Sequence, residues 1–355
     1  MTATLPSDAL QTARSGAVAL PTDAVVAVTL NCNARCTMCD IWKNRMEGEL
    51  QPEEFAALPS GLRTINITGG KPFLRNDLPE VLRVIRRTCP QARLVISTNG
   101  FLARRAAMLA PLLQEIPNLA VRISIDGIGD LHDRIRGTKG AFQRCLEFLN
   151  QLRDTGIRDL GFNLTLMEQN WSQLAAVYTL TRSLGIELGV TVVTDSPVYF
   201  GEGKQTLRPG DPGIELLQGL SQTEYRRWHP RYWVRGWFEK GLLEYLVHGQ
   251  RPLPCDAGRG FFYLDSMGNV LGCHVREGLL GNIRERSFAE IWRSAQAAAV
   301  REQLAGCQQC WMACTAKSAV RNHRWSVLGE VVSDKARAHL LRPTSSPGAA
   351  HPQLP

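Results

Sequence analysis

Eight of the ten cysteines in this 355-residue chain fall into two groups, and grouped thiols are metal ligands or disulfide partners. The first group is Cys32, Cys36 and Cys39, and the second is Cys255, Cys273, Cys307, Cys310 and Cys314. Disulfide frameworks are typical of short secreted chains, whereas the start of this chain lacks the basic and apolar blocks of a secretory signal. The sequence therefore predicts metal ligation by reduced thiols in the cytoplasm.

Composition excludes several classes of protein. Hydrophobic residues make up 44% and charged residues 21% of the chain, so it can bury a core. No run approaches the roughly 18 apolar residues of a membrane-spanning helix. The net charge of +8 is spread among acidic residues, which favours a solvated surface over a nucleic-acid interface. We expect neither a membrane nor a nucleic acid as partner.

The elements that position the first cysteine group alternate between strand and helix patterns. Short β-rich runs occur at Val25–Leu30, Thr64–Thr68, Arg93–Ser97, Ala120–Ile125, Gly161–Met167 and Glu187–Thr194. Helical periodicity is clearest at Leu78–Cys89, Ala103–Glu115, Phe142–Arg153 and Trp171–Leu184, and Pro111 should kink the second of these. Six such repeats predict an α/β fold, a partial (β/α)6 TIM-like barrel whose ligand site lies at the carboxyl ends of the strands.

The remaining segments define further parts of the chain. Residues 1–22 read as a disordered lead, 23–200 as the barrel, and 201–250 as an aromatic-rich helical connector. Residues 251–325 contain a predicted hairpin over 261–273, turning at Met267–Asn269, and a helix over Ser287–Arg301 with Ser287 as N-cap. Residues 326–355 form a C-terminal extension that we expect to be disordered from about 343.

The first cysteine group follows the first predicted strand with the spacing Cys-x3-Cys-x2-Cys. Three thiolates can hold three irons of a 4Fe–4S cube and leave the fourth iron open to chelate an amino and a carboxylate group. Zinc is the competing interpretation, although no fourth ligand is obvious nearby.

This loop resembles the hallmark of the radical S-adenosylmethionine (radical SAM) superfamily. ITGGKPFLR (Ile67–Arg75), STNG (Ser97–Gly100) and SIDGIGDLHDRIRG (Ser124–Gly137) follow later strands in the order of that family's motifs. The resemblance implies a 4Fe–4S cluster on Cys32, Cys36 and Cys39. It also implies that S-adenosylmethionine (SAM) is contacted by Gly69, Gly70, Lys71, Ser97, Asn99, Ser124, Arg136 and Asn163.

Lys71 departs from the family pattern, which usually has Glu at this position. That carboxylate would accept hydrogen bonds from the ammonium of the methionine moiety, whereas a lysine there is a like charge unless its stem swings outward. Three interpretations stay open: a tolerated variant, an impaired protein, or a shifted role in which Lys71 meets the ligand's carboxylate. We expect weaker SAM binding than in a Lys71→Glu variant.

The second cysteine group resembles the SPASM/twitch extension of radical SAM enzymes, which carries auxiliary 4Fe–4S clusters. The segments Gly268–Cys273 and Leu279–Trp292 resemble sequence motifs of that family. A full two-cluster SPASM domain would want about seven cysteines, so five favour one auxiliary cluster on Cys255, Cys273, Cys307 and Cys310, with Cys314 as a possible or spare ligand. Zinc is again the alternative. Cys89 and Cys145 read as core residues.

The resemblance implies an enzyme that cleaves SAM reductively to a 5′-deoxyadenosyl radical and abstracts a substrate hydrogen. An auxiliary cluster suits oxidation of a small molecule such as an aminocyclitol or sugar, with an external one-electron donor such as flavodoxin or ferredoxin. The alternatives are a peptide-modifying maturase and, if Lys71 abolishes SAM binding, a non-catalytic iron–sulfur protein. Only about twenty residues precede the first strand, which disfavours a fused leader-peptide recognition domain.

Several other polar residues are weaker candidates for a role in catalysis. Asp130, His132 and Asp133 follow the fourth strand, where capping of the loop is favoured over proton transfer. The weaker candidate proton acceptors are Tyr199, Glu202, His229 and His274, and Asp195 either faces the pocket or caps the next turn.

Overall fold

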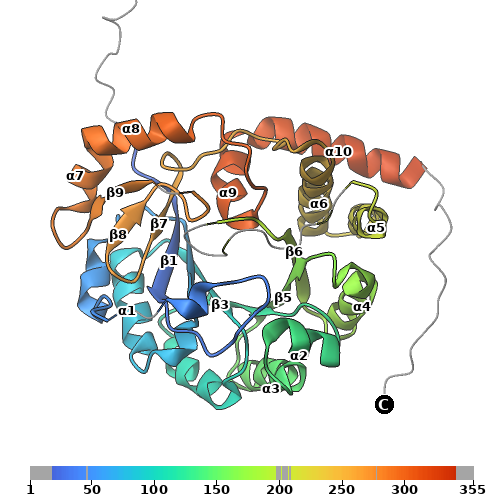
Figure 1. The fold of residues 1–355 in the computed structure, drawn as a ribbon, viewed down its shortest axis with the longest axis horizontal. Helices are drawn as coiled ribbons and strands as arrows, with labels where there is room; N and C mark the ends of the chain where they lie inside the picture. The colour runs from blue at the N-terminus through green and yellow to red at the C-terminus, as the bar shows by residue number, and fades with distance from the viewer. Residues whose placement is uncertain are drawn as a thin grey trace, which may run out of the picture.

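The computed structural model describes residues 18–44, 47–196, 201, 207, 209–276 and 278–340, which build one nine-stranded sheet flanked by helices (Figure 1). The strand order is β6-β5-β4-β3-β2-β1-β7-β8-β9. Neighbouring strands from β6 to β7 in this order are parallel, and β8 and β9 continue the sheet antiparallel. The strands are β1 (Asp23–Thr29), β2 (Thr64–Gly69), β3 (Arg93–Thr98), β4 (Ala120–Ser124), β5 (Asp159–Leu166), β6 (Glu187–Val192), β7 (Phe261–Leu264), β8 (Asn269–Leu271) and β9 (Leu279–Asn282).

The first six strands form the predicted partial barrel. Each ends within two residues of the predicted strand end, and the crossovers carry the helices on the outer face of the sheet. The barrel helices are η2 (Ile41–Lys43), η3 (Pro52–Ala57), η4 (Pro72–Leu74), α1 (Leu78–Thr88), η5 (Ala103–Leu112), α2 (Asp130–Arg136), α3 (Ala141–Asp154), η6 (Trp171–Gln173) and α4 (Leu174–Ser183). Element η5 is a 3₁₀ helix where an α-helix was expected, with Pro111 inside it.

The two faces of the barrel strands differ in polarity because side chains alternate across a sheet. On the outer face Ile65, Ile67, Leu94 and Ile96 are fully buried in the main core under the helices. The intervening positions point to the inner face and include half-buried polar side chains, namely Asn66, Thr68, Ser97, Ser124 and Asn163. A polar inner face in the middle of a parallel sheet is typical of a ligand-binding surface.

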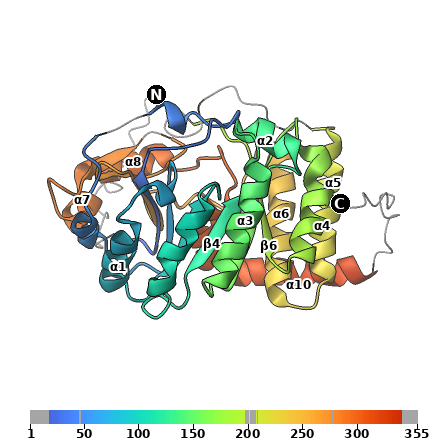
Figure 2. The ribbon, with the colours of Figure 1, turned by 90° about the horizontal axis from the view of Figure 1, so that it is seen from below.

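The aromatic-rich connector forms two helices, α5 (Pro212–Arg226) and α6 (Pro230–His248), in agreement with its predicted helical character. Figure 2 shows α4, α5 and α6 side by side beyond β6, and α10 (Arg324–Leu340) packs across α5 and α6. Tyr225 and Trp237 are buried here as part of the main core, whereas Trp228 is exposed. The connector therefore mainly packs the outer end of the sheet.

The C-terminal part joins the barrel through its sheet. The predicted hairpin is present as β7 and β8, and β7 pairs in parallel with β1. The predicted helix over Ser287–Arg301 is two helices, α7 (Phe288–Arg293) and α8 (Ala295–Leu304), because Ser294 adopts an extended conformation and caps the second. Ser287 and Glu290 form the expected capping box. Helix α9 (Ala313–Asn322) follows Cys310 and contains Cys314.

The described part of the N-terminal segment packs against the C-terminal part of the chain. Residues 18–22 of the predicted lead contact the C-terminal part, since Trp292 Nε1 donates to the Ala19 carbonyl at 3.0 Å and Thr22 N donates to the Gly260 carbonyl. Residues 1–17 and the predicted disordered tail from about 343 lie outside the described residues. Among the helices described, none has the length and apolarity needed to cross a bilayer.

Candidate functional site

The first cysteine group lies on the loop that leaves the carboxyl end of β1. Cys36 is buried, Cys32 and Cys39 are half-buried, and all three are free thiols. Burial raises the pKa of Cys39 to about 11, although a backbone hydrogen bond to Ile41 opposes it. Such a thiol stays protonated at neutral pH until a metal takes the place of its proton. The loop thus presents three metal donors together and no competing disulfide.

Helix α2 holds this loop in place. The backbone N–H groups of Arg35 and Thr37 donate to the carbonyls of Arg136 and Ile135 at 3.2 and 2.9 Å. These carbonyls belong to the last turn of α2, where carbonyls lack partners within the helix. Gly137 ends the helix with φ of 63°, and a Cβ there would lie 2.6 Å from the Arg35 carbonyl oxygen. The loop can approach the helix end only because residue 137 is glycine.

The Gly69–Gly70–Lys71 segment crosses the same loop at backbone distance. Gly70 N and Lys71 N donate to the carbonyls of Thr29 and Asn31 at 2.6 and 2.7 Å. A Cβ at Gly69 or at Gly70 would lie 2.0 Å from one of these carbonyl oxygens. The glycines therefore have a packing role that the sequence did not reveal, and their contact with a ligand stays a prediction.

Three expected SAM contacts, Ser97, Ser124 and Asn163, share the inner face of the barrel. Gly189 on β6 makes room for one of them, since a Cβ there would lie 2.6 Å from Asn163 Oδ1. Asn99 is instead buried and donates to Asn33 Oδ1 at 2.8 Å, which ties the end of β3 to the cysteine loop. The structure brings all four residues to the carboxyl side of the barrel without testing their contact with SAM.

Arg136 joins the cysteine loop to a buried carboxylate. Its Nη2 lies 2.5 Å from Asp126 Oδ2, and its Nη1 lies 3.6 Å from Cys36 Sγ. Burial lowers the pKa of Arg136, but Asp126 and Cys36 outweigh it and the net shift is upward. Asp126 is also fully buried and accepts from Thr165 N at 2.9 Å. The guanidinium is therefore fixed as a cation beside a cysteine sulfur.

Lys71 points toward this site rather than away from it. Its side chain is half-buried, and its charge acts on Cys39, on Asp126 and on Cys145. In each of these three groups burial raises the pKa and is the largest effect, and the Lys71 ammonium opposes it. A positive charge consequently stands at the mouth of the barrel where the family usually places a carboxylate.

Four cysteines of the second group are electrostatic neighbours of one another. Cys255 and Cys307 act on Cys273, and Cys273 and Cys255 act on Cys310. Burial raises the pKa of Cys273 to about 11, while Val275 N donates to its sulfur at 3.2 Å. The four residues come from segments far apart in the sequence, namely the loop after α6, the end of β8 and the α8–α9 connection.

Cys314 stands apart from these four. Its sulfur lies 3.7 Å from His274 Nε2, and Cys273 is the cysteine that affects its pKa, which burial raises to about 11. Cys314 also packs, with Cys32 and Cys39, against one apolar cluster made of Val25, Ala27, Leu30, Ile41 and Tyr263. We call this set the inner apolar cluster. It contacts two cysteines of the first group as well as Cys314.

The donor sets fit iron–sulfur ligation at both places. The first offers three thiols beside a polar inner face, which leaves one iron of a cube open, and the second offers four neighbouring thiols. Among the described residues no three His, Cys, Asp or Glu side chains converge closely enough to hold a single metal ion. Cys89 and Cys145 are fully buried, which confirms them as core residues.

Three of the weaker candidates take structural roles. Asp133 accepts from Gly140 N and Phe142 N at 2.5 and 2.8 Å, so it caps the start of α3. His132 is buried, and its Nδ1 accepts from Asp126 N at 3.0 Å. His229 caps α6 through Arg231 N. Tyr199 and Glu202 lie outside the described residues.

Sequence reasoning missed three charged residues that lie near the cysteine groups or the inner face of the sheet, namely Asp126, Arg251 and Lys317. Arg251 is buried, and its Nη1 lies 3.6 Å from Cys310 Sγ and donates to the Cys310 carbonyl. Nothing in the local pattern marks it, because its partner is 59 residues away in the sequence. Asp126 lies inside a quoted motif, yet only the fold shows that it is buried.

Comparison with known proteins agrees with this geometry. The model of the radical SAM superfamily matches residues 26–181, and the model of an iron–sulfur cluster-binding domain, SPASM, matches residues 255–315. The chain belongs to the radical SAM superfamily. More particularly, it is a radical SAM protein with a SPASM C-terminal domain.

Individual relatives differ in what their names describe. The chain is 30% identical over 306 residues to a protein of Methanosarcina barkeri named Fe-coproporphyrin III synthase, covering 75% of this chain and 72% of that protein. It is 25% identical over 297 residues to a PqqA peptide cyclase of Granulibacter bethesdensis, covering 78% and 75%. A solved structure of anSMEcpe with bound AdoMet and a peptide superposes with a TM-score of 0.61 at 17% identity, over 88% of this chain and 99% of that one. At this identity the match shows the shared fold.

Proposed function

We propose that this protein is a radical SAM oxidoreductase that removes a hydrogen atom and then an electron from a small-molecule substrate held in the barrel. The first cluster, when bound, supplies the electron that splits SAM into methionine and a 5′-deoxyadenosyl radical able to take the hydrogen atom. The second electron would leave the substrate for a single auxiliary cluster, and the accompanying proton would go to solvent. Substrate oxidation by two electrons is balanced in this way.

The observation that carries the proposal is the inner apolar cluster. Cys32 and Cys39 contact it from the first cysteine group, and Cys314 contacts it from the C-terminal part. Cys314 is an electrostatic neighbour of Cys273, a proposed ligand of the auxiliary cluster. Ligands of the first cluster and a neighbour of the second therefore contact one small group of side chains, which suits electron transfer through the substrate chamber. A structural iron–sulfur site would not need this proximity.

The roles of the chain's own residues follow from their positions. Cys32, Cys36 and Cys39 hold one cluster, and Cys255, Cys273, Cys307 and Cys310 hold the other. Ser97, Ser124 and Asn163 on the inner face, with Asn99, Gly69 and Gly70 behind them, are proposed to orient SAM. Arg136, fixed by Asp126, stands between the cysteine loop and this face. Lys71 adds a positive charge beside this site and is proposed to weaken SAM binding by repelling the SAM ammonium.

The choice of a small molecule is supported by the names of relatives, which refer to coproporphyrin and to haem in the proteins at 30% and 29% identity. The sequence-based expectation of an aminocyclitol or sugar substrate depends on the cysteine pattern alone. An external one-electron donor such as flavodoxin or ferredoxin would supply electrons to the first cluster.

The test is turnover of the anaerobically reconstituted protein with dithionite and SAM. We expect 5′-deoxyadenosine, and iron and sulfide near eight per chain, as two 4Fe–4S cubes require. Candidate aminocyclitols and coproporphyrin III carrying deuterium at the reacting position should pass the label into 5′-deoxyadenosine. Absence of 5′-deoxyadenosine from protein with both clusters full would favour a non-catalytic iron–sulfur protein.

A peptide-modifying maturase is the second candidate function. It is supported by the similarity to the PqqA peptide cyclase and by a sporulation killing factor maturation protein at 24% identity. The same labelling experiment separates the two functions, because deuterium would then enter 5′-deoxyadenosine from a peptide and from none of the small molecules.

A further inference from the structure

Helix α9 lies against the inner face of the sheet at two points. Near its start, Cys314 packs on the inner apolar cluster, whose Val25, Ala27 and Tyr263 are inner-face residues of β1 and β7. Two turns later, Arg321 Nη1 lies 2.7 Å from Asp23 Oδ2, at the first residue of β1. The helix therefore lies against the inner face, with its last turns at the beginning of β1.

Lys317 lies between these two contacts. Positions three and four apart share one face of a helix, so Lys317 faces the same way as Cys314 and Arg321. Its electrostatic neighbours agree with this direction, since Arg93 on β3 and Arg122 on β4 are both inner-face residues. The side chain is half-buried. Burial lowers the pKa of Lys317 and Arg93 adds to the shift, while Cys314 and Asp23 oppose it.

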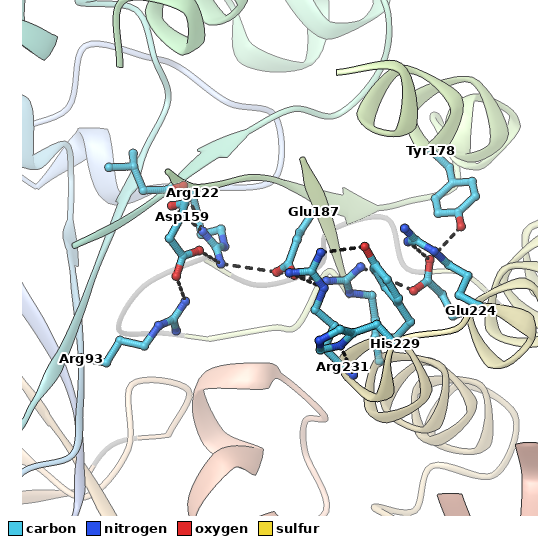
Figure 3. A network of polar contacts seen from close by, with 12 residues as sticks. Arg93, Arg122, Asp159, Tyr178, Glu187, Glu224, His229 and Arg231 are labelled. Carbon is cyan, nitrogen blue, oxygen red and sulfur yellow. Dashed lines mark hydrogen bonds and ion pairs between the residues drawn. The ribbon is translucent and has the colours of Figure 1, made fainter. Parts of the chain in front are cut away.

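The carboxylates around Lys317 are already paired with arginines. Figure 3 shows Asp159 between Arg93 and Arg122, at 2.5 and 2.8 Å, and Glu187 beyond them. Glu187 Oε2 lies 3.0 Å from Arg235 and 3.5 Å from Arg122. Asp23 is taken by Arg321.

Lys317 is consequently left with a surplus of positive charge. No carboxylate of the described residues lies within 4.0 Å of its ammonium, whereas each nearby arginine has one. A half-buried ammonium without a counter-ion costs free energy, and an anionic ligand group would remove that cost. Lys317 carries a single charge, which the single charge of a carboxylate would match.

We propose that Lys317 forms the floor of the substrate chamber and binds a carboxylate of the substrate. The proposal rests on the proposed function in one respect, namely that the substrate enters the barrel. It adds that the substrate is an acid. A small carboxylic acid and the glutamate of a peptide offer the same group, and the two are distinguished experimentally.

The test uses the holoprotein and two pairs of probes. Glutarate is compared with glutaramide, and N-acetylglutamate N-methylamide with its glutamine analogue, by calorimetry on the wild type, Lys317→Met and Lys139→Met. Lys139 is exposed and serves as the matched control. We expect at least one acid to bind the wild type and Lys139→Met alike, and Lys317→Met about tenfold or more weakly, the effect of one charge-assisted hydrogen bond. The neutral probes should not distinguish the variants.

Protection of Lys317 from acetylation gives a second measurement that requires no variant. The acid that binds should slow acetylation of Lys317, read by mass spectrometry, and leave Lys139 unaffected. Equal affinity of both acids for wild type and Lys317→Met, no binding of either acid, or stronger protection by inorganic phosphate would each overturn the proposal. Neither measurement needs turnover, so carboxylate binding at Lys317 can hold even where no 5′-deoxyadenosine is formed.

Discussion

At the scale of single residues, the two cysteine groups each have one buried arginine beside a sulfur, but the two arginines differ in counter-charge. Arg136 is 3.6 Å from Cys36 Sγ and is paired with Asp126. Arg251 is 3.6 Å from Cys310 Sγ, and no carboxylate of the described residues lies within ion-pair distance of it. A cation next to a cluster stabilises the reduced, more negative state. The uncompensated charge of Arg251 should therefore favour electron acceptance at the second group.

Replacing Arg251 tests this difference. In Arg251→Met we expect the reduction potential of the auxiliary cluster to fall by about 60 mV or more, a tenfold change for a one-electron couple. The potential of the first cluster should stay unchanged. An anaerobic redox titration followed by electron paramagnetic resonance measures both.

Arg301 supplies the matched control for Arg251. It is also buried in the C-terminal part, and it donates to the carbonyls of Gly258 and Trp292 rather than approaching a cysteine sulfur. Arg301→Met should lower stability and leave both potentials in place. Equal shifts in the two variants would mean that Arg251 acts through folding alone.

Lys71 is the residue whose charge most directly concerns SAM. The ammonium points toward Cys39 and Asp126, so a SAM ammonium beside it would be a like-charge contact. We expect Lys71→Glu to bind SAM more tightly than the wild type, measured by calorimetry on the cluster-loaded protein. Equal or weaker binding would favour the role of Lys71 as a partner of the SAM carboxylate. Lys71→Met, which removes the charge alone, separates attraction by Glu from relief of repulsion.

At the scale of elements, the cysteine loop depends on the end of α2. Gly137 and Gly140 both have positive φ, of 63° and 72°, so alanine strains both positions alike. A Cβ at 137 meets the Arg35 carbonyl at 2.6 Å, whereas a Cβ at 140 meets nothing within 4 Å. The two glycines therefore separate backbone strain from displacement of the loop.

We expect Gly137→Ala to lose the first cluster and keep the second, so that bound iron falls from about eight to about four per chain. Gly140→Ala should keep both clusters and lose only about 1 kcal/mol of stability. Iron analysis after anaerobic reconstitution measures the first effect, and denaturant unfolding the second. Full iron in Gly137→Ala would show that the loop tolerates a shifted helix end.

Much of the element order could be predicted because its signals are local. The strand runs and the capping box of Ser287 depend on neighbouring residues, and both are present in the structure. The break at Ser294 and the 3₁₀ form of η5 were missed because packing decides between closely similar helical conformations. The joining of β7 to β1 was also missed, since pairing of strands more than 230 residues apart leaves no local pattern.

The candidate site divides in the same way. Thiol spacing predicted both cysteine groups, and strand ends predicted the side on which Ser97, Ser124 and Asn163 lie. Asp126, Arg251 and Lys317 could not be found from sequence, because their importance comes from burial and from partners distant in the chain. A buried charge is visible only once the surfaces that cover it are known.

At the scale of the whole molecule, stability should depend on pH through buried histidine. Burial lowers the pKa of His132 to about 3, from the 6.5 of an exposed histidine. Below pH 6.5 the unfolded chain binds a proton that the folded chain does not, so stability falls as pH decreases from 6.5 toward 3. Each pH unit in this window should cost about 1.4 kcal/mol through His132.

We expect His132→Asn, which can still accept from Asp126 N, to flatten the pH dependence of unfolding by that slope between pH 6.5 and 5.5. Urea unfolding of the anaerobic holoprotein at several pH values measures the slope. His323→Asn is the control, because His323 is exposed. Parallel curves for wild type and His132→Asn would mean that the buried imidazole is protonated in the folded state.

The pairing of β7 with β1 also limits how such a protein can be recombined. Asp23–Val26 hydrogen-bond along one side to β2 and along the other to Phe261–Leu264. A chimera cut in the connector must therefore import a strand whose ladder matches the recipient's first strand. Without that match the graft would leave an open sheet border, which invites association between copies. Exchange of C-terminal domains among relatives is thus limited first by the pairing of β7 with β1, whatever the cofactor or substrate.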